Sequence, residues 1–202
     1  MSQERNTEEQ IIAAAKKIFS TKGLAGARMQ DIADEAGINK AMLHYYYRSK
    51  EKLFEIVFTE ALDKLMDRMS NVINANLPLP DKIREIVKNY IEGLTENPQL
   101  PLFVLNELQQ QPELLVKQFK TKPNFPNIQQ FLMEIAVAGE KGIIKKISPL
   151  QLMLNILSMC VFPFAAKPLL KGVTGIDEVQ FKLLIEERKQ VVADFILAAI
   201  TP

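Results

Sequence analysis

Hydrophobic residues recur every three to four positions along most of the chain, the spacing that buries one face of an α-helix. The first such segment begins at a capping pattern, Thr7 followed by Gln10, and ends at Gly23. A helix over residues 50–74, capped by Ser49, is predicted from an apolar stripe of Leu53, Phe54, Val57, Phe58, Ala61, Leu62, Leu65 and Met69. Since no segment alternates with the period of two that half-buried strands show, the sequence predicts an all-α fold.

Proline and glycine residues divide the rest of the chain. A Leu-Pro-Leu-Pro run at 77–80 precedes a helix whose apolar face is Ile83, Ile86, Val87, Tyr90, Ile91 and Leu94. Further prolines predict shorter helices near 101–111, 113–121 and 126–139. Ser148-Pro149 starts a helix that we expect to continue through Pro163 with a kink. The last helix starts at Asp177 with the apolar face Phe181, Leu184, Ile185, Val192, Phe195, Ile196 and Ala199, which brings the expected total to about nine helices.

Composition excludes several classes of protein. With 48% hydrophobic and 24% charged residues in 202, the chain is neither disordered nor of low complexity. The single cysteine, Cys160, excludes a disulfide scaffold and a zinc site with several thiolates. The single histidine, His44, leaves too few ligands for common transition-metal sites and disfavours a histidine-based catalytic triad. No phosphate-cradling glycine loop is present, so we expect neither a metal nor a cofactor.

The chain also lacks the marks of export or membrane insertion. The first residues contain no apolar signal-peptide core. The most apolar stretch, near residues 150–170, is interrupted by Gln151, Asn155, Pro163 and Pro168. We therefore expect a cytoplasmic protein with no membrane contact.

Residues 28–47 follow the pattern of a helix-turn-helix. Ile32 and Ala36 share one face of a short first helix, and Gly37 permits the tight turn after it. On the second helix the residues that pack back toward the first are Ile38, Leu43 and Tyr47. The residues left facing outward are Asn39, Lys40, Met42, His44, Tyr45 and Tyr46. Such cationic, aromatic and hydrogen-bonding groups on a short helix suit the major groove of DNA.

Local charge supports this interpretation. The whole chain has a formal net charge of +1, but residues 16–52 hold eight Lys or Arg against four Asp or Glu, which gives +4 there and −3 elsewhere. A solvated helical hairpin with no partner is the alternative interpretation. The run of three tyrosines at 45–47 argues against it, because such a run is costly to leave in water.

Three segments of this region carry a specific resemblance. They are Ile-Ile-Ala-Ala-Ala at 11–15 with Phe19 and Gly23, Asp-Ile-Ala at 31–33 with Ala-Gly-Ile at 36–38, and Leu-His-Tyr-Tyr-Tyr-Arg-Ser-Lys-Glu-Lys-Leu-Phe at 43–54. In these segments the chain resembles the N-terminal domain of TetR-family repressors. The match covers about a quarter of the chain, and the rest matches in architecture alone.

The resemblance implies a homodimer that binds a palindromic double-stranded DNA operator and is released when a small-molecule effector binds. It divides the chain into a helix-turn-helix domain, 1–52, and a ligand-sensing and dimerisation domain, 53–202, whose last two helices form a four-helix bundle with the partner. By position, Lys40 matches a lysine that contacts phosphate or base, and Tyr45 and Tyr46 match an aromatic pair at the DNA backbone. Lys50 matches a lysine at the start of the fourth helix, where phosphate is also favoured.

Three positions depart from the family pattern. His44 stands where tyrosine is commoner, and it is interpreted as a polar contact, with a pH-sensitive switch as the alternative. Ala41 replaces a frequent glycine and can place a methyl group against a thymine methyl. Arg28 stands where a hydroxyl residue often caps the second helix, and it is the expected substitute for that phosphate contact. The residues expected at DNA are Arg28, Gln30, Asn39, Lys40, Ala41, Met42, His44, Tyr45, Tyr46 and Lys50.

The remainder of the chain is rich in Phe, Met and Leu, which suits an apolar ligand pocket. Each such residue taken singly is explained equally well by core packing. We expect the central helices to enclose a mainly apolar ligand, with Gln109 as a further polar group beside the set Tyr90, Phe103, Asn106, Phe119, Phe131, Asn155 and Met159.

Two rival functions remain open from the sequence. An enzyme could use acids such as Glu107, Glu134 or Glu140, but helical-bundle metal sites pair glutamates with histidines, and the one histidine lies in the helix-turn-helix. The second rival is a ligand-independent activator or structural DNA binder on the same fold. The identity of the effector and the operator sequence are not encoded in any pattern of the chain.

Overall fold

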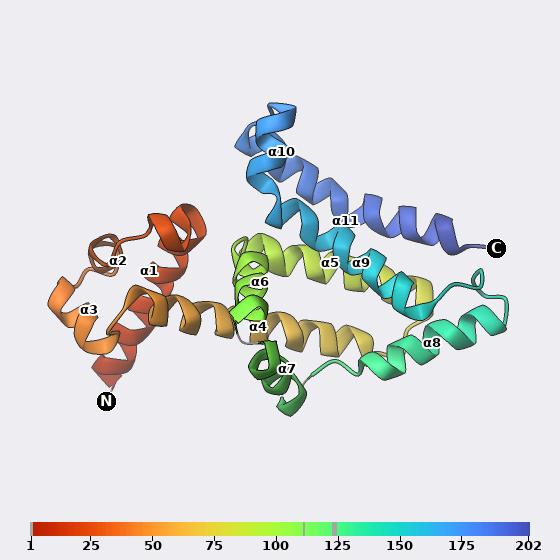
Figure 1. Ribbon diagram of the computed structural model, residues 1–202, viewed down its shortest axis with the longest axis horizontal. Coiled ribbons are helices and arrows are strands. Elements are labelled where there is room, and N and C mark those ends of the chain that lie inside the picture. The colour runs from red at the N-terminus through yellow and green to blue at the C-terminus, as the bar shows by residue number, and fades with distance from the viewer. Residues whose placement is uncertain (1, 111, 123–124) are drawn as a thin grey trace.

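The computed structural model describes residues 2–110, 112–122 and 125–202, without the side chains of residues 2–5, 114, 115, 118 and 119. These residues form helices and no strand, so the predicted all-α fold is confirmed (Figure 1). The helices in the described ranges are α1 (Ser2–Gly26), α2 (Met29–Glu35), α3 (Lys40–Tyr46), α4 (Lys50–Ile73), α5 (Leu79–Glu96), α6 (Leu100–Gln110), α7 (Pro112–Thr121), α8 (Ile128–Glu140), α9 (Pro149–Ala165), α10 (Lys167–Thr174) and α11 (Glu178–Ile200).

These eleven segments of the described chain exceed the nine or so expected, and one reason is the segment after Pro163. That proline lies inside α9, as predicted, but the helix ends at Ala165 and the chain bends by 70° into α10. Within the described residues no single helix is long and apolar enough to span a membrane.

The first helix begins earlier than predicted. It starts at Ser2 rather than at Thr7, since the residues in between include Gln3, Glu4 and Arg5, which are good helix formers. Gly23 breaks the helix as expected, with a φ of 65° inside the segment that ends at Gly26.

The long helix α4 joins the two ends of the molecule (Figure 1). Ser49 caps it as predicted, its Oγ accepting a hydrogen bond from the Lys52 amide at 3.1 Å. All eight residues of its predicted apolar stripe are buried. We call α1 to α3 with the first two turns of α4 the head, and the remainder of the chain the body.

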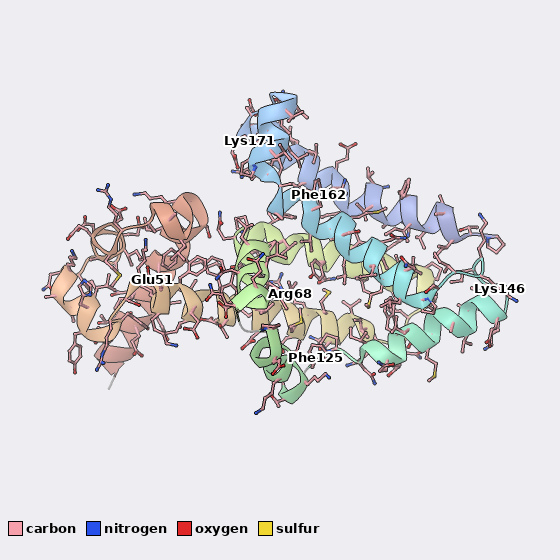
Figure 2. All side chains as sticks on the ribbon, in the orientation of Figure 1. Glu51, Arg68, Phe125, Lys146, Phe162 and Lys171 are labelled. Atoms are coloured by element: carbon pink, nitrogen blue, oxygen red, sulfur yellow. The ribbon has the colours of Figure 1, made fainter. Side chains whose placement is uncertain are left out.

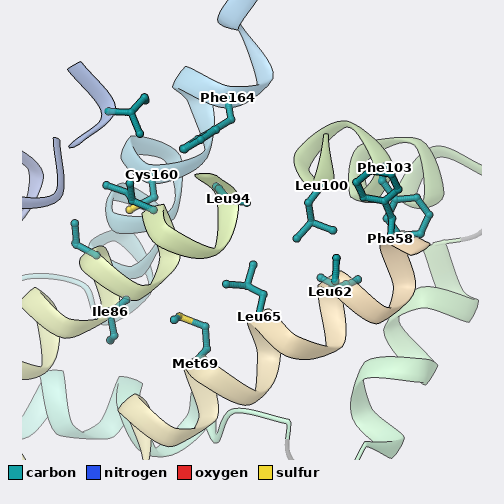
Figure 3. Packing of buried hydrophobic residues seen from close by; sticks show 14 of the residues in the cluster. Phe58, Leu62, Leu65, Met69, Ile86, Leu94, Leu100, Phe103, Cys160 and Phe164 are labelled. Atoms are coloured by element: carbon teal, nitrogen blue, oxygen red, sulfur yellow. The ribbon is translucent and has the colours of Figure 1, made fainter. Parts of the chain in front are cut away.

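Aromatic packing fixes α4 to both parts. In the head, the Phe19 ring of α1 lies edge-on to Phe54 of α4, with centroids 4.9 Å apart. One turn later, Phe58 lies 5.9 Å from Phe103 of α6, where the body begins (Figure 3). Because one helix carries both contacts, a movement of α4 in the body also moves the head.

In the body, α5 packs between α4 and α11, and α9 crosses over α5, α8 and α11 (Figure 1). Gly93 allows the close approach of α4 and α5, since a Cβ there would lie 2.7 Å from Leu65 Cδ1. The last helix, α11, starts at Asp177 as predicted, and Asp177 forms a capping box with Gln180. Ser148 also precedes its helix as predicted, but its hydroxyl makes no capping hydrogen bond.

Candidate DNA interface and ligand cavity

One face of α3 is anchored in the head and the other faces solvent. Leu43 is fully buried, and Ile38 and Tyr47 pack partly against the same core, as the sequence predicts. On the side of α3 that faces away from this core, the exposed residues are Lys40, Ala41, Met42, His44 and Tyr45. Tyr45 is 85% exposed, which is costly for a large aromatic residue without a partner.

Two residues of the expected outward set are partly used within the protein. Asn39 is exposed, but its Oδ1 accepts a hydrogen bond from the Met42 amide at 2.7 Å and so caps α3. Tyr46 is half-buried rather than outward, because it packs against the core and lies edge-on to Tyr45 with centroids 5.6 Å apart. Tyr46 therefore supports the position of Tyr45.

The cations of the head divide into two groups. Lys17 pairs with Glu35 at 2.6 Å and Lys22 with Asp31 at 2.7 Å, and the hydrogen bond from Lys22 lowers the pKa of Asp31. In contrast, Lys40, Arg48 and Lys50 have no ion pair within the described ranges. These three cations leave uncompensated positive charge around α3 and the start of α4.

Helix α2 packs against α3, and three residues separate the end of α3 from the start of α4. Arg28 occupies the N-cap position of α2, is exposed, and forms no side-chain capping bond. Gln30 is also exposed, but its amide donates to Asp34 Oδ1 at 2.7 Å. At the start of α4, Lys50 is the first helical residue and Glu51 follows it within the head (Figure 2). A helix start with a lysine at its first position favours a phosphate.

A second feature lies at the far end of α4, in the body. A cavity of about 210 Å³ opens between α4, α5, α8 and α9. Met69 of α4 and Ile86 of α5 face this space from opposite sides (Figure 3). The lining residues in the part of the chain that the structure describes are mainly apolar: Met66, Met69, Ile73, Ile86, Tyr90, Phe125, Pro126, Ile128, Phe131, Met153, Ile156 and Leu157.

Two of the seven residues expected at a ligand, Tyr90 and Phe131, line this cavity, and four lie elsewhere. Phe103 packs in the core against Phe54 and Phe58, at 5.9 Å from each ring. Asn106 and Asn155 are exposed, and Asn106 accepts a hydrogen bond from Gln110 at the surface; Gln109 is exposed as well. Helical period alone does not tell a core aromatic from a cavity aromatic, and an amide on an apolar helix need not turn inward.

Met159 is half-buried outside the lining, and its carbonyl accepts two hydrogen bonds from the Arg188 guanidinium. The side chain of Phe119 lies outside the described residues. Sequence reasoning missed the contribution of α4 to the cavity, since Met66, Met69 and Ile73 belong to the same stripe as the core residues. A signal was available in the methionines, which are frequent where packing leaves adaptable space.

The acids considered for an enzyme are dispersed. Glu134 of α8 accepts a hydrogen bond from Lys82 Nζ at 2.6 Å, Glu107 is half-buried on α6, and Glu140 is exposed at the end of α8. Lys82 was not singled out from the sequence, yet only 2% of its surface is exposed. Its ammonium also donates to the Ile73 carbonyl, the last residue of α4, at 2.9 Å.

Comparisons with known proteins agree with this geometry. Residues 11–57 match the family model described as bacterial regulatory proteins, tetR family. The chain is 33% identical over 79 residues to the HTH-type transcriptional repressor KstR2 of Mycolicibacterium smegmatis, an alignment that covers 39% of this chain and 38% of that one. It is 27% identical over 187 residues to the HTH-type transcriptional regulator RutR of Escherichia coli K12, which covers 91% and 87%.

A solved structure extends the likeness across the molecule. The crystal structure of a mutant of the HlyIIR protein superposes with a TM-score of 0.63 at 26% identity, covering 98% of both chains. The matched segment 11–57 contains the exposed face of α3 and the start of α4. Over residues 11–57 the chain therefore has the DNA-binding segment of the TetR family of transcriptional regulators.

Proposed function

We propose that the protein is a cytoplasmic repressor that binds a palindromic operator as a homodimer and leaves it when a small, mainly apolar molecule occupies the cavity. The observation that carries this proposal is the course of α4, whose first residue, Lys50, is separated from the end of α3 by three residues and whose last turns line the cavity. The names of the relatives, a repressor and a regulator, support the same function.

At the operator, α3 would lie in the major groove. Lys40, Ala41, Met42 and His44 are the exposed residues suited to base edges and nearby phosphates. Tyr45 would pack along the sugar-phosphate backbone, with Arg28, Gln30, Asn39, Tyr46 and Lys50 around it. We keep the division into 1–52 and 53–202 as part of this proposal, with the first turns of α4 packed against the DNA-binding part.

The dimer would form through the exposed apolar stripes of α9 and α11. Exposed apolar residues recur at multiples of four residues on both helices, with Ser158 and Glu187 at the two positions between: Leu150, Leu154 and Phe162 on α9, and Val179, Leu183, Val191 and Phe195 on α11. Phe195 and Leu183 are 61% and 65% exposed in the single chain. Patches of this kind on two adjacent helices favour a partner, and a second copy gives the symmetric four-helix arrangement.

Release from DNA requires that the ligand prefer one of two conformations. A ligand between α4 and α8 would favour the arrangement in which α4 is displaced, and the head would move with it. Half-sites on a two-fold operator are about 34–36 Å apart, or a multiple of this, so a shift of a few ångströms between the two α3 helices would weaken binding.

A binding titration with the operator tests the DNA contacts. The operator can be selected from the DNA that flanks the coding region, where an inverted repeat is expected. We expect Lys40→Ala to weaken binding strongly. If Lys50 contacts phosphate alone, Lys50→Ala should weaken binding about equally across sequences and lower the slope of log K against log salt by about 1.

Lys88→Ala is the matched control, because Lys88 is an exposed lysine of α5 in the body. Unchanged affinity and slope for Lys50→Ala would remove this residue from the interface. A reporter with the operator placed over or upstream of a promoter separates a repressor from the ligand-independent activator or structural binder. Activation from the upstream position, with no effect of any cavity ligand, would contradict the proposal.

A further inference from the structure

The walls of the cavity restrict the charge of its ligand. Among the twelve lining residues that the structure describes there is no acidic, basic or amide side chain. The nearest charges named above, Lys82 and Glu134, are not part of the lining and pair with each other. An ionised ligand would lose its hydration without gaining a counter-charge, which is strongly unfavourable in an apolar site. A ligand that fits these walls is therefore neutral.

One polar group interrupts the apolar lining. The Tyr90 hydroxyl is the single side-chain oxygen among the lining residues, and it has no hydrogen-bond partner within the described part of the chain. Burial raises the pKa of Tyr90 to about 12, so its hydroxyl keeps its proton at neutral pH. It is thus a hydrogen-bond donor on a lining residue, and the other described lining side chains carry no oxygen or nitrogen that could accept from it.

The volume and the lining of the cavity further restrict which ligands can fit. An apolar cavity of about 150 Å³ holds one benzene molecule. The volume of about 210 Å³ here leaves room for a single ring with a small substituent. Methionine sulfurs contact aromatic rings favourably, and three methionines line the space: Met66, Met69 and Met153.

We infer that the cavity takes a neutral, single-ring compound that bears one carbonyl-type acceptor, with the Tyr90 hydroxyl donating to that acceptor. This inference rests on the proposed function, in which the cavity is the effector site, and it names the chemical class of the effector. It excludes a ligand whose carboxylate is buried among these walls. Tyr90 is the specificity-determining residue, since its hydroxyl distinguishes an acceptor-bearing ring from a hydrocarbon.

Three probes of similar size and shape test the inference on the full-length protein. Acetophenone carries the ring and the carbonyl, isopropylbenzene replaces the carbonyl by a methyl-bearing carbon, and benzoate carries a charge. By calorimetry or ligand-observed NMR at neutral pH, we expect acetophenone to bind at least fivefold more tightly than isopropylbenzene, and benzoate to show no binding.

The variant Tyr90→Phe isolates the hydrogen bond. It should weaken the binding of acetophenone about five- to tenfold, as expected for the loss of one hydrogen bond. The affinity for isopropylbenzene should be unchanged or slightly higher. Melting temperature and circular dichroism establish that the variant is folded. Ile86→Trp, which fills the cavity, should abolish binding of both neutral probes and so locates them in this site.

Binding of benzoate as tight as that of acetophenone would overturn the inference, and so would an acetophenone affinity unaffected by Tyr90→Phe. Failure of both neutral probes to bind would overturn it as well. The proposed function is tested separately, by adding acetophenone to the operator complex. If acetophenone binds with the expected dependence on Tyr90 but leaves operator affinity unchanged, the ligand class holds and the proposed release mechanism is wrong.

Discussion

Lys82 is the one charged side chain that the described part of the chain buries, and its two partners show why it is tolerated. Its ammonium compensates the free carbonyl at the end of α4 and the Glu134 carboxylate of α8. The interaction therefore joins two walls of the cavity, although neither charged group lines it. Substituting Lys82 should change the stability of the protein by a different amount from substituting Glu134, because Lys82 is buried and Glu134 is half-buried.

We predict that Glu134→Gln destabilises the protein more than Lys82→Met. The first change leaves a buried cation without its counter-charge, which costs about 2–3 kcal/mol after allowance for the partial exposure of Glu134. The second removes the cation and leaves a carboxylate that can rehydrate, so its cost should be lower by at least about 1 kcal/mol. Urea unfolding at one protein concentration measures both. If the two variants lost the same free energy of unfolding, or if Lys82→Met lost more, the Lys82–Glu134 pair would not determine the loss of stability.

We predict that the buried thiol of Cys160 makes the protein less stable at alkaline pH. Burial raises the pKa of its thiol to about 12, and the nearby Arg188 offsets this only in part. The folded pKa lies above the ordinary value of 9.0, so the contribution to stability is complete below pH 9 and is lost as pH rises toward 12. By about pH 10.5 the loss should be about 2 kcal/mol. Cys160→Ala should show a shallower fall of melting temperature from pH 7 to 10.5, whereas Ser158→Ala, an exposed neighbour, should follow the native curve.

At the level of helices, α9 and α11 each bury one face and expose another. This second face is apolar although solvent surrounds it in the single chain. Phe162 marks it on α9, close to the bend into α10 (Figure 2). Each helix thus has a second apolar face that a partner can cover.

We predict that Leu183→Glu and Phe195→Glu each convert a dimer into a monomer. A carboxylate at either position would be desolvated against the partner's apolar stripe. Light scattering at micromolar concentration measures the state directly. Met133→Glu is the control, because Met133 is 67% exposed on α8, outside the two stripes. A native protein that is monomeric, or a dimer that survives both changes, would place the interface elsewhere.

The positions of the helices could largely be predicted from the sequence, because the spacing of apolar residues and the side-chain caps both depend on residues that are close together in the chain. The start of α4 at Ser49 and of α11 at Asp177 agree with the structure, since a side-chain cap satisfies a local amide. The start of α1 was not predicted, because Thr7 can be part of a capping pattern and also continue a helix. The exposed face of α3 also followed from period, with Tyr46 as the exception.

The cavity lining was less predictable, because it depends on how distant helices meet. Met69 and Leu65 belong to one apolar stripe, but only Met69 lines the cavity while Leu65 packs against Gly93. The close approach at Gly93 brings α5 to α4 at one point and leaves space further along. Such a difference arises from tertiary packing, which no periodicity within one helix records.

At the scale of the whole molecule, α4 links the two candidate sites as one continuous helix. It packs against α1 in the head and against α5 in the body, so it cannot move in one without repacking in the other. Packed interfaces of this kind adopt discrete arrangements rather than deforming continuously. This makes the distance between the two heads of a dimer the quantity that a cavity ligand should change.

We predict that this distance changes when the cavity is filled and that distances within the body do not. Spin labels at Ala25→Cys, an exposed head position, would report the separation of the two heads by pulsed electron resonance, and labels at Lys88→Cys would report the body. The native Cys160 is buried, so labelling is selective. Operator DNA should narrow the distribution of distances between the two labels on the heads. Acetophenone should shift this distribution by a few ångströms, while the distance between the two labels at Lys88→Cys stays constant. Release of DNA with an unchanged head distance would show that α4 does not transmit the signal as a lever, and the coupling would then lie in the loosening of α3 itself.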